Sequence, residues 1–469
     1  MTVAASPRSV HASWRVCLML CVIALSSVST TASASLLADR LEVSMYGRIG
    51  ASWDPTTGRY VQGARMNPTG SAIGGRMEEG DYFEPTLKLH LLERNTDPNA
   101  QYVDFVLTPA MYMKAGLLLG VISDRFTDAL DIELFQGYME AGNIGIQGLR
   151  VWGGARFYRG TDVHIADTFY FNNLAGQGGG IAYGPLDLAI IMNTTTNSAQ
   201  YNYDVDGNGT LDLRRQRTVF VAQYAHKFEA GHSLHGLAEL HVLPTAKVTL
   251  ADGSRVGLND DLGWVVGVKG HLDLGNGSFN DVSLRYGSRA ASGSRGGAQT
   301  FDSFGTPGTQ GRYDEAAGVQ FVEHFLYNFS PLFSLNAYGM LHYNMGLGNR
   351  DPLTNTQPEA TSLDFGVGAR GALYLHQHFH LLGEVHYAGL KPNSDADMAT
   401  VTKFSIIPTF VPLAGNSLWN RPHFRLFYTL ALFNEASVAG RYSPYQQLFA
   451  ASENKKVGHY VGARVEWWF

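Results

Sequence analysis

The feature that most constrains the fold is the alternation of apolar and polar side chains, which is clearest over residues 461–469. The apolar positions are Val461, Ala463, Val465, Trp467 and Phe469, and the positions between them are Gly462, Arg464, Glu466 and Trp468. Successive side chains of a β-strand point to opposite faces, so a period of two predicts a strand with one apolar and one polar face. Strands of this kind, with lipid on one side and water on the other, build transmembrane β-barrels.

The same alternation recurs along the chain, and polar connections separate the alternating segments. It is present at 41–53, 333–338 and 379–387. A tight turn is expected at 375–378, and the long polar stretches expected to form outer loops are 56–80, 193–216, 287–312 and 345–362. The mean hydropathy of −0.10 is near neutral, as it should be when only one face of each strand is apolar. At roughly 24 residues per strand and connection the chain supplies about 18 strands, so we expect an all-β, transmembrane antiparallel barrel.

The first residues have the features of a secretory signal peptide. Arg8 and Arg15 form a basic start, residues 16–25 are apolar, and a stretch of small residues suits cleavage. The apolar run is much shorter than the roughly 20 residues that a membrane-spanning helix needs. We therefore expect residues 1–34 to be removed and residues 35–469 to form a barrel in the outer membrane of a Gram-negative bacterium.

Removal of that segment also changes the cysteine content and the net charge of the mature chain. Cys17 and Cys21 are its two cysteines and both are removed, which excludes a thiolate nucleophile, a cysteine metal site and a disulfide. Without Arg8 and Arg15 the 35 basic residues become 33, and against 41 acidic residues this gives a net charge of −8. An acidic balance argues against a nucleic-acid partner, because binding to phosphates depends on basic side chains.

Residues 152–171 carry a distinctive motif, Trp-Gly-Gly-Ala-Arg-Phe-Tyr-Arg-Gly-Thr-Asp-Val-His-Ile-Ala-Asp-Thr-Phe-Tyr-Phe. This stretch resembles the hallmark of the maltoporin family, the carbohydrate-specific porins. Further segments that match the family in the same order are Tyr46-x-Arg48, 81–84, 138–143, Phe279-Asn280, 417–422 and Glu466-Trp467-Trp468. The resemblance implies a homotrimer of barrels of about this size, each with an outer loop folded into a pore that passes oligosaccharides. The final Phe469 also resembles the signal that the outer-membrane assembly machinery recognises.

The resemblance assigns an aromatic stripe along the pore wall to Tyr46, Tyr82, Phe279, Trp419 and Trp468. Sugar rings have apolar faces that stack on aromatic side chains, and a row of such contacts lets the ligand move from one to the next. In the alternation pattern each of the five lies on the polar parity of its segment, with apolar neighbours one residue away. The alternative is a belt of aromatics at the membrane interface, which is common in barrels, but the shared inward parity favours the stripe.

Polar partners for the sugar hydroxyls follow from the same resemblance. They are Arg48, Arg76, Glu84, Arg159, Asp162 and Asp167, and the aromatic Phe169 of the inward loop is added to them. The alternative is an ordinary solvated pore wall. The chain departs from the family pattern at the constriction, because Gly160 stands where an arginine is typical, with Arg159 beside it, and Phe169 replaces a tyrosine. The resemblance therefore implies a less cationic, more apolar constriction and leaves the preferred sugar open.

One polar stretch resembles a calcium-binding loop. Its candidate ligands are Asp204, Asp206, Asn208 and Asp212, which supply oxygen atoms at alternate positions, as a hard cation requires. The twelfth position, normally a glutamate that binds through both oxygens, is Arg215. We favour an acidic, glycine-rich outer loop without an ion, and a calcium site is the alternative. No cofactor is required by the remainder of the sequence.

Three functions are compatible with an exported barrel. A passive porin selective for maltodextrin or another oligosaccharide is favoured by the aromatic stripe. A general diffusion porin of the same fold is the alternative, since the expected constriction arginine is replaced. A barrel enzyme would need a serine or aspartate next to a histidine, and no motif links any of the sixteen histidines to a nucleophile, so we expect no enzymatic activity.

Overall fold

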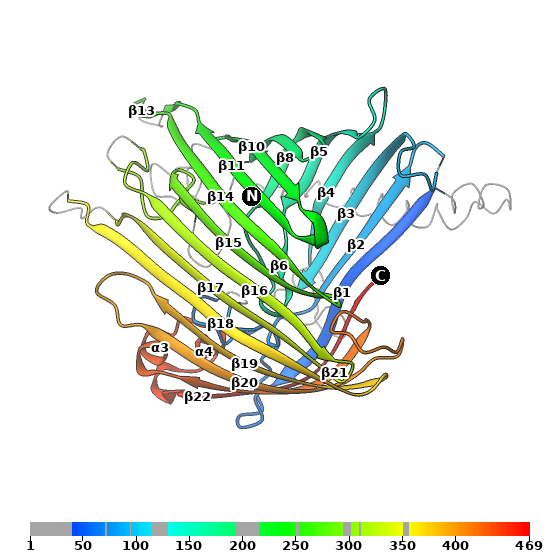
Figure 1. Ribbon diagram of the computed structural model, residues 1–469. Coiled ribbons are helices and arrows are strands. Elements are labelled where there is room, and N and C mark those ends of the chain that lie inside the picture. The colour runs from blue at the N-terminus through cyan, green and yellow to red at the C-terminus, as the bar shows by residue number, and fades with distance from the viewer. Residues whose placement is uncertain are drawn as a thin grey trace, which may run out of the picture.

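The computed structural model describes residues 40–70, 73–93, 95–113, 130–193, 215–249, 253–293, 302–308, 311–349 and 356–469. Within these residues, one 18-stranded antiparallel sheet closes on itself, as expected for the barrel. Each strand pairs with its neighbours in chain order, and the first strand, β1, also pairs with the last, β22. Figure 1 shows the strands following one another around the wall from blue β1 to red β22.

The element bounds are as follows. The strands of the barrel are β1 (Leu41–Trp53), β2 (Tyr82–His90), β3 (Tyr102–Met113), β4 (Leu130–Gly142), β5 (Leu149–Arg159), β8 (Asn173–Tyr183), β9 (Leu186–Asn193), β10 (Arg217–Lys227), β11 (Ser233–Leu243), β14 (Asp261–Gly275), β15 (Ser278–Arg289), β16 (Ala317–Ser330), β17 (Phe333–Leu347), β18 (Glu359–His376), β19 (Phe379–Lys391), β20 (Ala399–Phe410), β21 (His423–Phe433) and β22 (Val457–Trp468). Two short hairpins lie outside the barrel sheet, β6 (Asp162–Val163) with β7 (Thr168–Phe169), and β12 (Ala246–Thr249) with β13 (Arg255–Leu258). The short helices are η3 (His164–Ala166), η4 (Glu229–Gly231), α3 (Glu435–Gly440), α4 (Pro444–Gln447) and η5 (Ala451–Glu453).

No helix in the described part of the chain is both long enough and apolar enough to cross a membrane.

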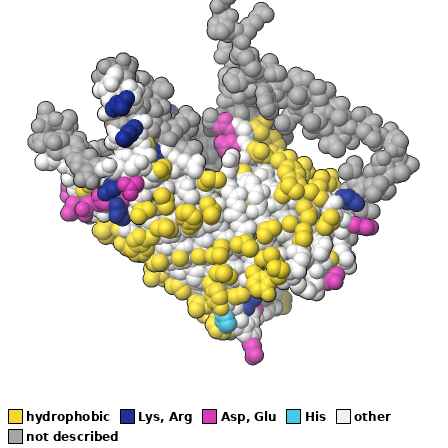
Figure 2. Space-filling model, turned by 90° about the horizontal axis from the view of Figure 1, so that it is seen from above, with side chains coloured by type: hydrophobic (Ala, Val, Ile, Leu, Met, Phe, Trp, Pro, Cys, Tyr) yellow, Lys and Arg dark blue, Asp and Glu magenta, His cyan; other side chains and the backbone are white. Residues whose placement is uncertain are grey.

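The alternation of the sequence matches the two faces of the wall. On β1, Val43 and Trp53 are 46% and 45% exposed, whereas Ser52 is 1% exposed. On β22, Glu466 is buried, and the outward Phe469 that follows the strand is exposed. Apolar side chains therefore cover the outside, where they form a broad band in Figure 2, with acidic and basic side chains near its edges on this face.

Connections at the two ends of the barrel differ in length. The short ones include 143–148, 184–185, 276–277, 331–332 and 377–378, and the long ones include 54–81, 160–172, 290–316 and 434–456. The two-residue turn at 377–378 confirms the tight turn expected there. Most of the polar stretch at 193–216 lies outside the described residues.

The connection between β5 and β8, residues 160–172, folds into the barrel and is called the constriction loop below. It contains the β6–β7 hairpin and η3. Tyr170 is fully buried and its hydroxyl donates to Asp281 Oδ2 at 3.3 Å, while Lys269 Nζ donates to Thr161 Oγ1 at 2.9 Å. Because Asp281 and Lys269 lie on the wall strands β15 and β14, these contacts hold the loop inside and confirm the expected inward-folded loop.

The connection 54–81, which contains a stretch expected to be an outer loop, also folds back inside the barrel. The Gly74 amide donates to the Tyr338 hydroxyl at 3.0 Å, and Lys403 Nζ lies 2.8 Å from Glu78 Oε2. Both wall residues point inward, and the apolar side chains of the segment are buried against the same wall. The segment is thus one of the long connections at the end of the barrel where outer loops were expected, but it folds inward, because its buried ion pair and apolar contacts hold it against the wall.

Candidate functional site

Three aromatic residues from adjacent strands line up at the closure of the barrel. Tyr46 on β1 faces Trp468 on β22, with which it is in register, and its ring centroid lies 6.4 Å from that of Trp468 in a stacked arrangement. On the other side, the ring of Tyr82 on β2 lies 5.8 Å from Tyr46. Since β1 pairs with both β2 and β22, the closed sheet brings together residues that are distant in sequence.

Trp419 joins this group from a turn rather than from a strand. It lies in the connection 411–422, before β21, so the strand-parity argument does not apply to it. The imidazole of His164, at the tip of the constriction loop, is 6.0 Å from the Trp419 ring and 5.2 Å from the Trp468 ring. We call Tyr46, Tyr82, Trp468, Trp419 and His164 the aromatic cluster.

Phe279 is inward-facing on β15, as its parity predicted, but it stands apart from the cluster. Its ring stacks on His271 at 6.0 Å and meets the edge of His324 at 5.0 Å. Among the described residues, no ring contact connects it to the other aromatics of the expected stripe. The structure therefore brings four of those five residues together and leaves the fifth on a distant part of the wall.

A network of opposite charges lies beside the cluster. Arg76 Nε contacts Glu79 Oε2 at 2.8 Å, and Arg76 Nη2 lies 3.4 Å from Glu466 Oε1. Arg48 Nη1 lies 3.3 Å from Glu79 and 3.6 Å from Asp167. Arg76, Glu79 and Glu466 are at most 1% exposed, so these side chains form a fixed set of charges rather than a mobile surface.

The hydroxyl of Tyr46 connects the aromatic cluster to this network. It donates to Glu466 Oε1 at 3.1 Å and accepts from Arg48 Nη1 at 3.1 Å and Arg76 Nη2 at 2.6 Å. A buried polar group with its partners satisfied is held in one orientation. The network therefore fixes the position of the Tyr46 ring.

The other expected polar residues occupy the same region. The Tyr82 hydroxyl donates to Glu84, and Asp162 Oδ2 lies 3.8 Å from His164 Nδ1. Arg159 ends β5, and its guanidinium lies over the ring of Phe169 on β7. All the expected polar residues thus lie in the part of the barrel that the constriction loop enters.

Several residues of the site were not singled out from the sequence. Arg421 lies over the Trp468 ring at 3.7 Å, and both Arg421 and Arg425 form ion pairs with Glu466, at 3.2 and 2.8 Å. Arg425 lies on the inward parity of β21, so the alternation contained a signal for it. Glu79 lies in an irregular segment with no alternation, and no sequence signal pointed to it.

Burial and neighbouring charges shift the pKa values of the loop residues. Burial, and then the nearby Glu79 carboxylate, raise the pKa of Asp167 to about 6. Burial alone would also raise the pKa of Glu79, but the guanidinium groups of Arg48 and Arg76 outweigh it and hold that pKa well below its usual range. Burial and Arg76 lower the pKa of His164 to about 4, so this imidazole is neutral at neutral pH.

The candidate calcium ligands, Asp204, Asp206, Asn208 and Asp212, lie outside the described residues, as does the expected signal peptide, 1–34. In the part of the chain that the structure describes, no group of three or more histidine, cysteine, aspartate or glutamate side chains could hold a metal ion.

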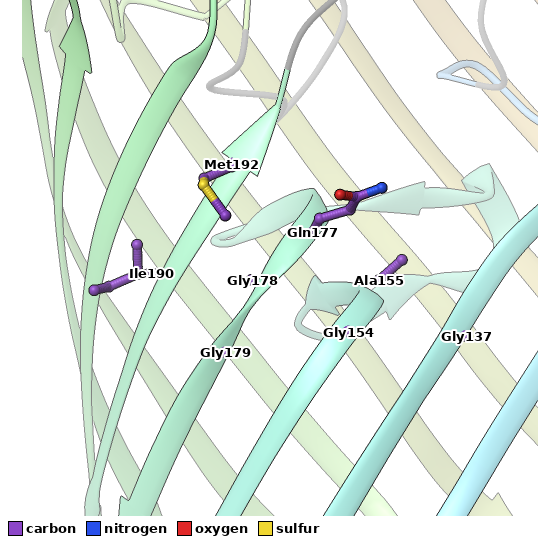
Figure 3. A pocket seen from close by; sticks show the side chains of 8 residues that line it. All are labelled: Gly137, Gly154, Ala155, Gln177, Gly178, Gly179, Ile190 and Met192. Atoms are coloured by element: carbon purple, nitrogen blue, oxygen red, sulfur yellow. The ribbon is translucent and has the colours of Figure 1, made fainter.

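A separate hollow of about 550 Å³ lies in the wall formed by β4, β5, β8 and β9 (Figure 3). Its lining residues are Gly137, Gly154, Ala155, Gln177, Gly178, Gly179, Ile190 and Met192. Ile190 and Met192 are exposed on the outer face, so the hollow opens outward. It contains none of the expected site residues.

Together, an apolar outer wall, a closed sheet and a charged interior narrowed by an inward loop define a porin-type membrane channel. The family model for LamB porin matches residues 41–469, and the chain therefore belongs to the LamB porin family. This confirms the resemblance noted from the motifs. The protein is a multi-pass β-barrel of the Gram-negative outer membrane, and its family is one of channels rather than enzymes.

Solved structures also match this chain over most of its length, at low identity. OccK9 of Pseudomonas aeruginosa has 10% identity over 92% of this chain and 99% of that chain, with a TM-score of 0.45. OccAB1 of Acinetobacter baumannii has 12% identity over 92% and 96%, with a TM-score of 0.42. An anion-selective porin of Comamonas acidovorans has 10% identity over 92% and 100%, with a TM-score of 0.40. These likenesses are too distant to carry function or assembly to this chain.

Proposed function

We propose that this porin is a sugar-selective channel that passes oligosaccharides passively along the aromatic cluster. The observation that carries the proposal is the row formed by Tyr82, Tyr46 and Trp468, bordered by the ion-pair network around Glu466. A saccharide offers apolar ring faces to the aromatics and hydroxyl groups to the charges. The two kinds of surface lie side by side here.

Transport by this route needs contacts that are numerous and individually weak, so that the ligand can leave as well as enter. Stacking on one aromatic ring contributes about 0.5–1.5 kcal/mol. A few such contacts give a dissociation constant on the order of millimolar. The buried arginines and acids around Glu466 hold the rings in place, whereas Asp162 and Asp167, with side chains 36% and 29% exposed, can exchange hydrogen bonds with the sugar hydroxyls.

The decisive experiment is single-channel recording in planar bilayers with added maltose, maltotriose and maltohexaose. We expect a concentration-dependent block of the ion current that weakens in Trp419→Ala and Trp468→Ala. The matched control is Trp467→Ala, because this neighbour faces outward and should leave the block unchanged. An unchanged current with every sugar would identify a general diffusion porin instead.

We further propose, from the family resemblance, that the protein is a homotrimer embedded in outer-membrane lipid and that the assembly machinery recognises its final strand. Cross-linking in native membranes tests the trimer, and removal of Phe469 tests assembly. A calcium ion bound by Asp204, Asp206, Asn208 and Asp212 is the alternative to an acidic outer loop without an ion. Calcium content after chelation and re-addition tests that site.

A further inference from the structure

Arg159 is held in an unusual way at the edge of the constriction. Its guanidinium carbon lies 3.8 Å from the ring centroid of Phe157 and 3.9 Å from that of Phe169. No ring contact joins Phe157 to Phe169 among the described residues, so the guanidinium lies between the two rings. Stacking of this kind uses the faces of the guanidinium and leaves its N–H edges available.

The other arginines near the aromatic cluster are already engaged. Arg48, Arg76, Arg421 and Arg425 form ion pairs, and Arg464 donates to backbone carbonyl groups. The side chain of Arg159, in contrast, makes no hydrogen bond and no ion pair with any residue in the described part of the chain. It is the arginine at this site whose donors remain open to a ligand.

The acids that face Arg159 have other partners. Glu84, Asp162 and Asp167 lie within electrostatic range of its guanidinium. Glu84 accepts from the Tyr82 hydroxyl, Asp162 faces His164, and Asp167 faces Arg48 and Arg76. These acids can accept hydrogen bonds from sugar hydroxyls, while the planar N–H edge of Arg159 matches the two oxygens of a carboxylate.

We propose that Arg159 gives this pore a preference for saccharides that carry a carboxylate, and that Phe157 and Phe169 are the residues that position it. This inference rests on the proposed sugar-porin function and names its substrate class. A hydroxyl group offers a neutral acceptor, whereas a carboxylate accepts two charge-assisted hydrogen bonds from one guanidinium, and these are about twice as strong. Phe169, expected from the sequence to contact sugar, acts here through Arg159.

The test compares trigalacturonate with maltotriose, a neutral sugar of the same length, as blockers of the single-channel current. In the unmodified channel, we expect trigalacturonate to reach half-block at the lower concentration. Arg159→Gln should raise that concentration roughly ten-fold or more, because a hydrogen bond to a charged group is lost. The half-blocking concentration of maltotriose should rise by a smaller factor, because a hydroxyl group accepts only a weaker hydrogen bond from the same guanidinium.

Two further variants separate direct binding from the general effect of charge. Arg150→Gln removes the same charge from an exposed position on the same strand and should leave half-block by both sugars nearly unchanged. Phe169→Leu keeps the charge of Arg159 but removes one stacking partner. It should raise the half-blocking concentration of trigalacturonate several-fold, and by a larger factor than that of maltotriose.

The outcomes distinguish this inference from the proposed function. If maltotriose blocks the channel but Arg159→Gln leaves trigalacturonate block unaltered, the inference is wrong and the sugar porin stands. Equal losses in Arg159→Gln and Arg150→Gln would show long-range electrostatics and also overturn the inference. If neither sugar blocks the unmodified channel, the proposed function itself fails.

Discussion

The aromatic cluster and Phe279 show two ways in which the same barrel holds an aromatic ring in its pore. The ring of Tyr46 has aromatic neighbours on both sides, and its hydroxyl is bonded to Glu466, Arg48 and Arg76. Phe279 has no polar atom and contacts two imidazoles on neighbouring strands. The difference indicates that ion pairs fix the first region, whereas the wall strands alone position the second.

This contrast has a consequence for a ligand that moves through the pore. A ring that is held by a buried network loses little side-chain entropy when a sugar stacks on it. We therefore expect the cluster to provide the stronger contacts and Phe279 to provide a weaker one. Substitutions in the two regions should reveal that ranking.

The largest expected effect is a loss of folding stability in the Glu466→Gln variant. This carboxylate pairs with Arg76, Arg421 and Arg425, and its loss leaves buried guanidinium groups uncompensated, at a cost of about 3–5 kcal/mol. The matched change beside Phe279 is His324→Ala, which should lower the free energy of unfolding by about 1 kcal/mol. Urea unfolding of the barrel in lipid measures both. Equal losses would show that the two regions are held alike.

The next effect is on ligand contact. Trp468→Ala removes the ring that stacks on Tyr46, and we expect the half-blocking sugar concentration to rise by up to roughly ten-fold, since one stacking contact contributes at most about 1.5 kcal/mol. Phe279→Ala should raise it only about two- to three-fold, in keeping with its fewer neighbours. Current block by maltohexaose is the measurement. A larger effect of Phe279→Ala would reverse the ranking.

A smaller effect is expected from pH on the ion selectivity of the channel. It should arise beside the aromatic cluster and not near Phe279. Because the pKa of Asp167 is raised to about 6, this carboxyl is charged at pH 7.5 and neutral at pH 5. The negative charge is therefore lost as the pH falls, and the channel should become less selective for cations, with a midpoint near pH 6. Reversal potentials in a salt gradient report this change. Asp167→Asn should remove the pH-dependent step, and a step that persists would assign it to another group.

The smallest effect is expected outside both regions, among the connections at the long-loop end. Tyr445→Phe removes a hydrogen bond of 2.6 Å to Asp54, at a cost of about 1 kcal/mol. Sugar block should stay as in the unmodified protein, because neither residue lies at the aromatic cluster. A change in block after this substitution would mean that the outer connections take part in binding.

Much of the fold was predictable because the alternation of the sequence acts through a simple geometric rule. Inward parity alone predicts that Tyr46, Tyr82, Phe279 and Trp468 lie on the lumen side, and the structure has them there. The rule applies only within strands. It therefore could not place Trp419, which lies in a turn, or show that the polar segment 54–81 folds back into the barrel.

The composition of the site was harder to predict than the direction of its side chains. The pairing of Glu466 with Arg421 and Arg425 depends on the register between β21 and β22 and on the turn before β21. The stacking of Arg159 between Phe157 and Phe169 depends on how the constriction loop returns to β5. Such contacts between distant segments have no local signature in the sequence.

The binding site can form only when β1 pairs with β22. Tyr46 comes from the first strand of the sheet and Trp468 from the last, and their rings meet only where these two strands are hydrogen-bonded. A barrel whose seam is still open would have neither the aromatic row nor the carboxylate of Glu466 beside Arg76. The capacity to bind a ligand therefore arises in the same step that removes the last free edge of the sheet.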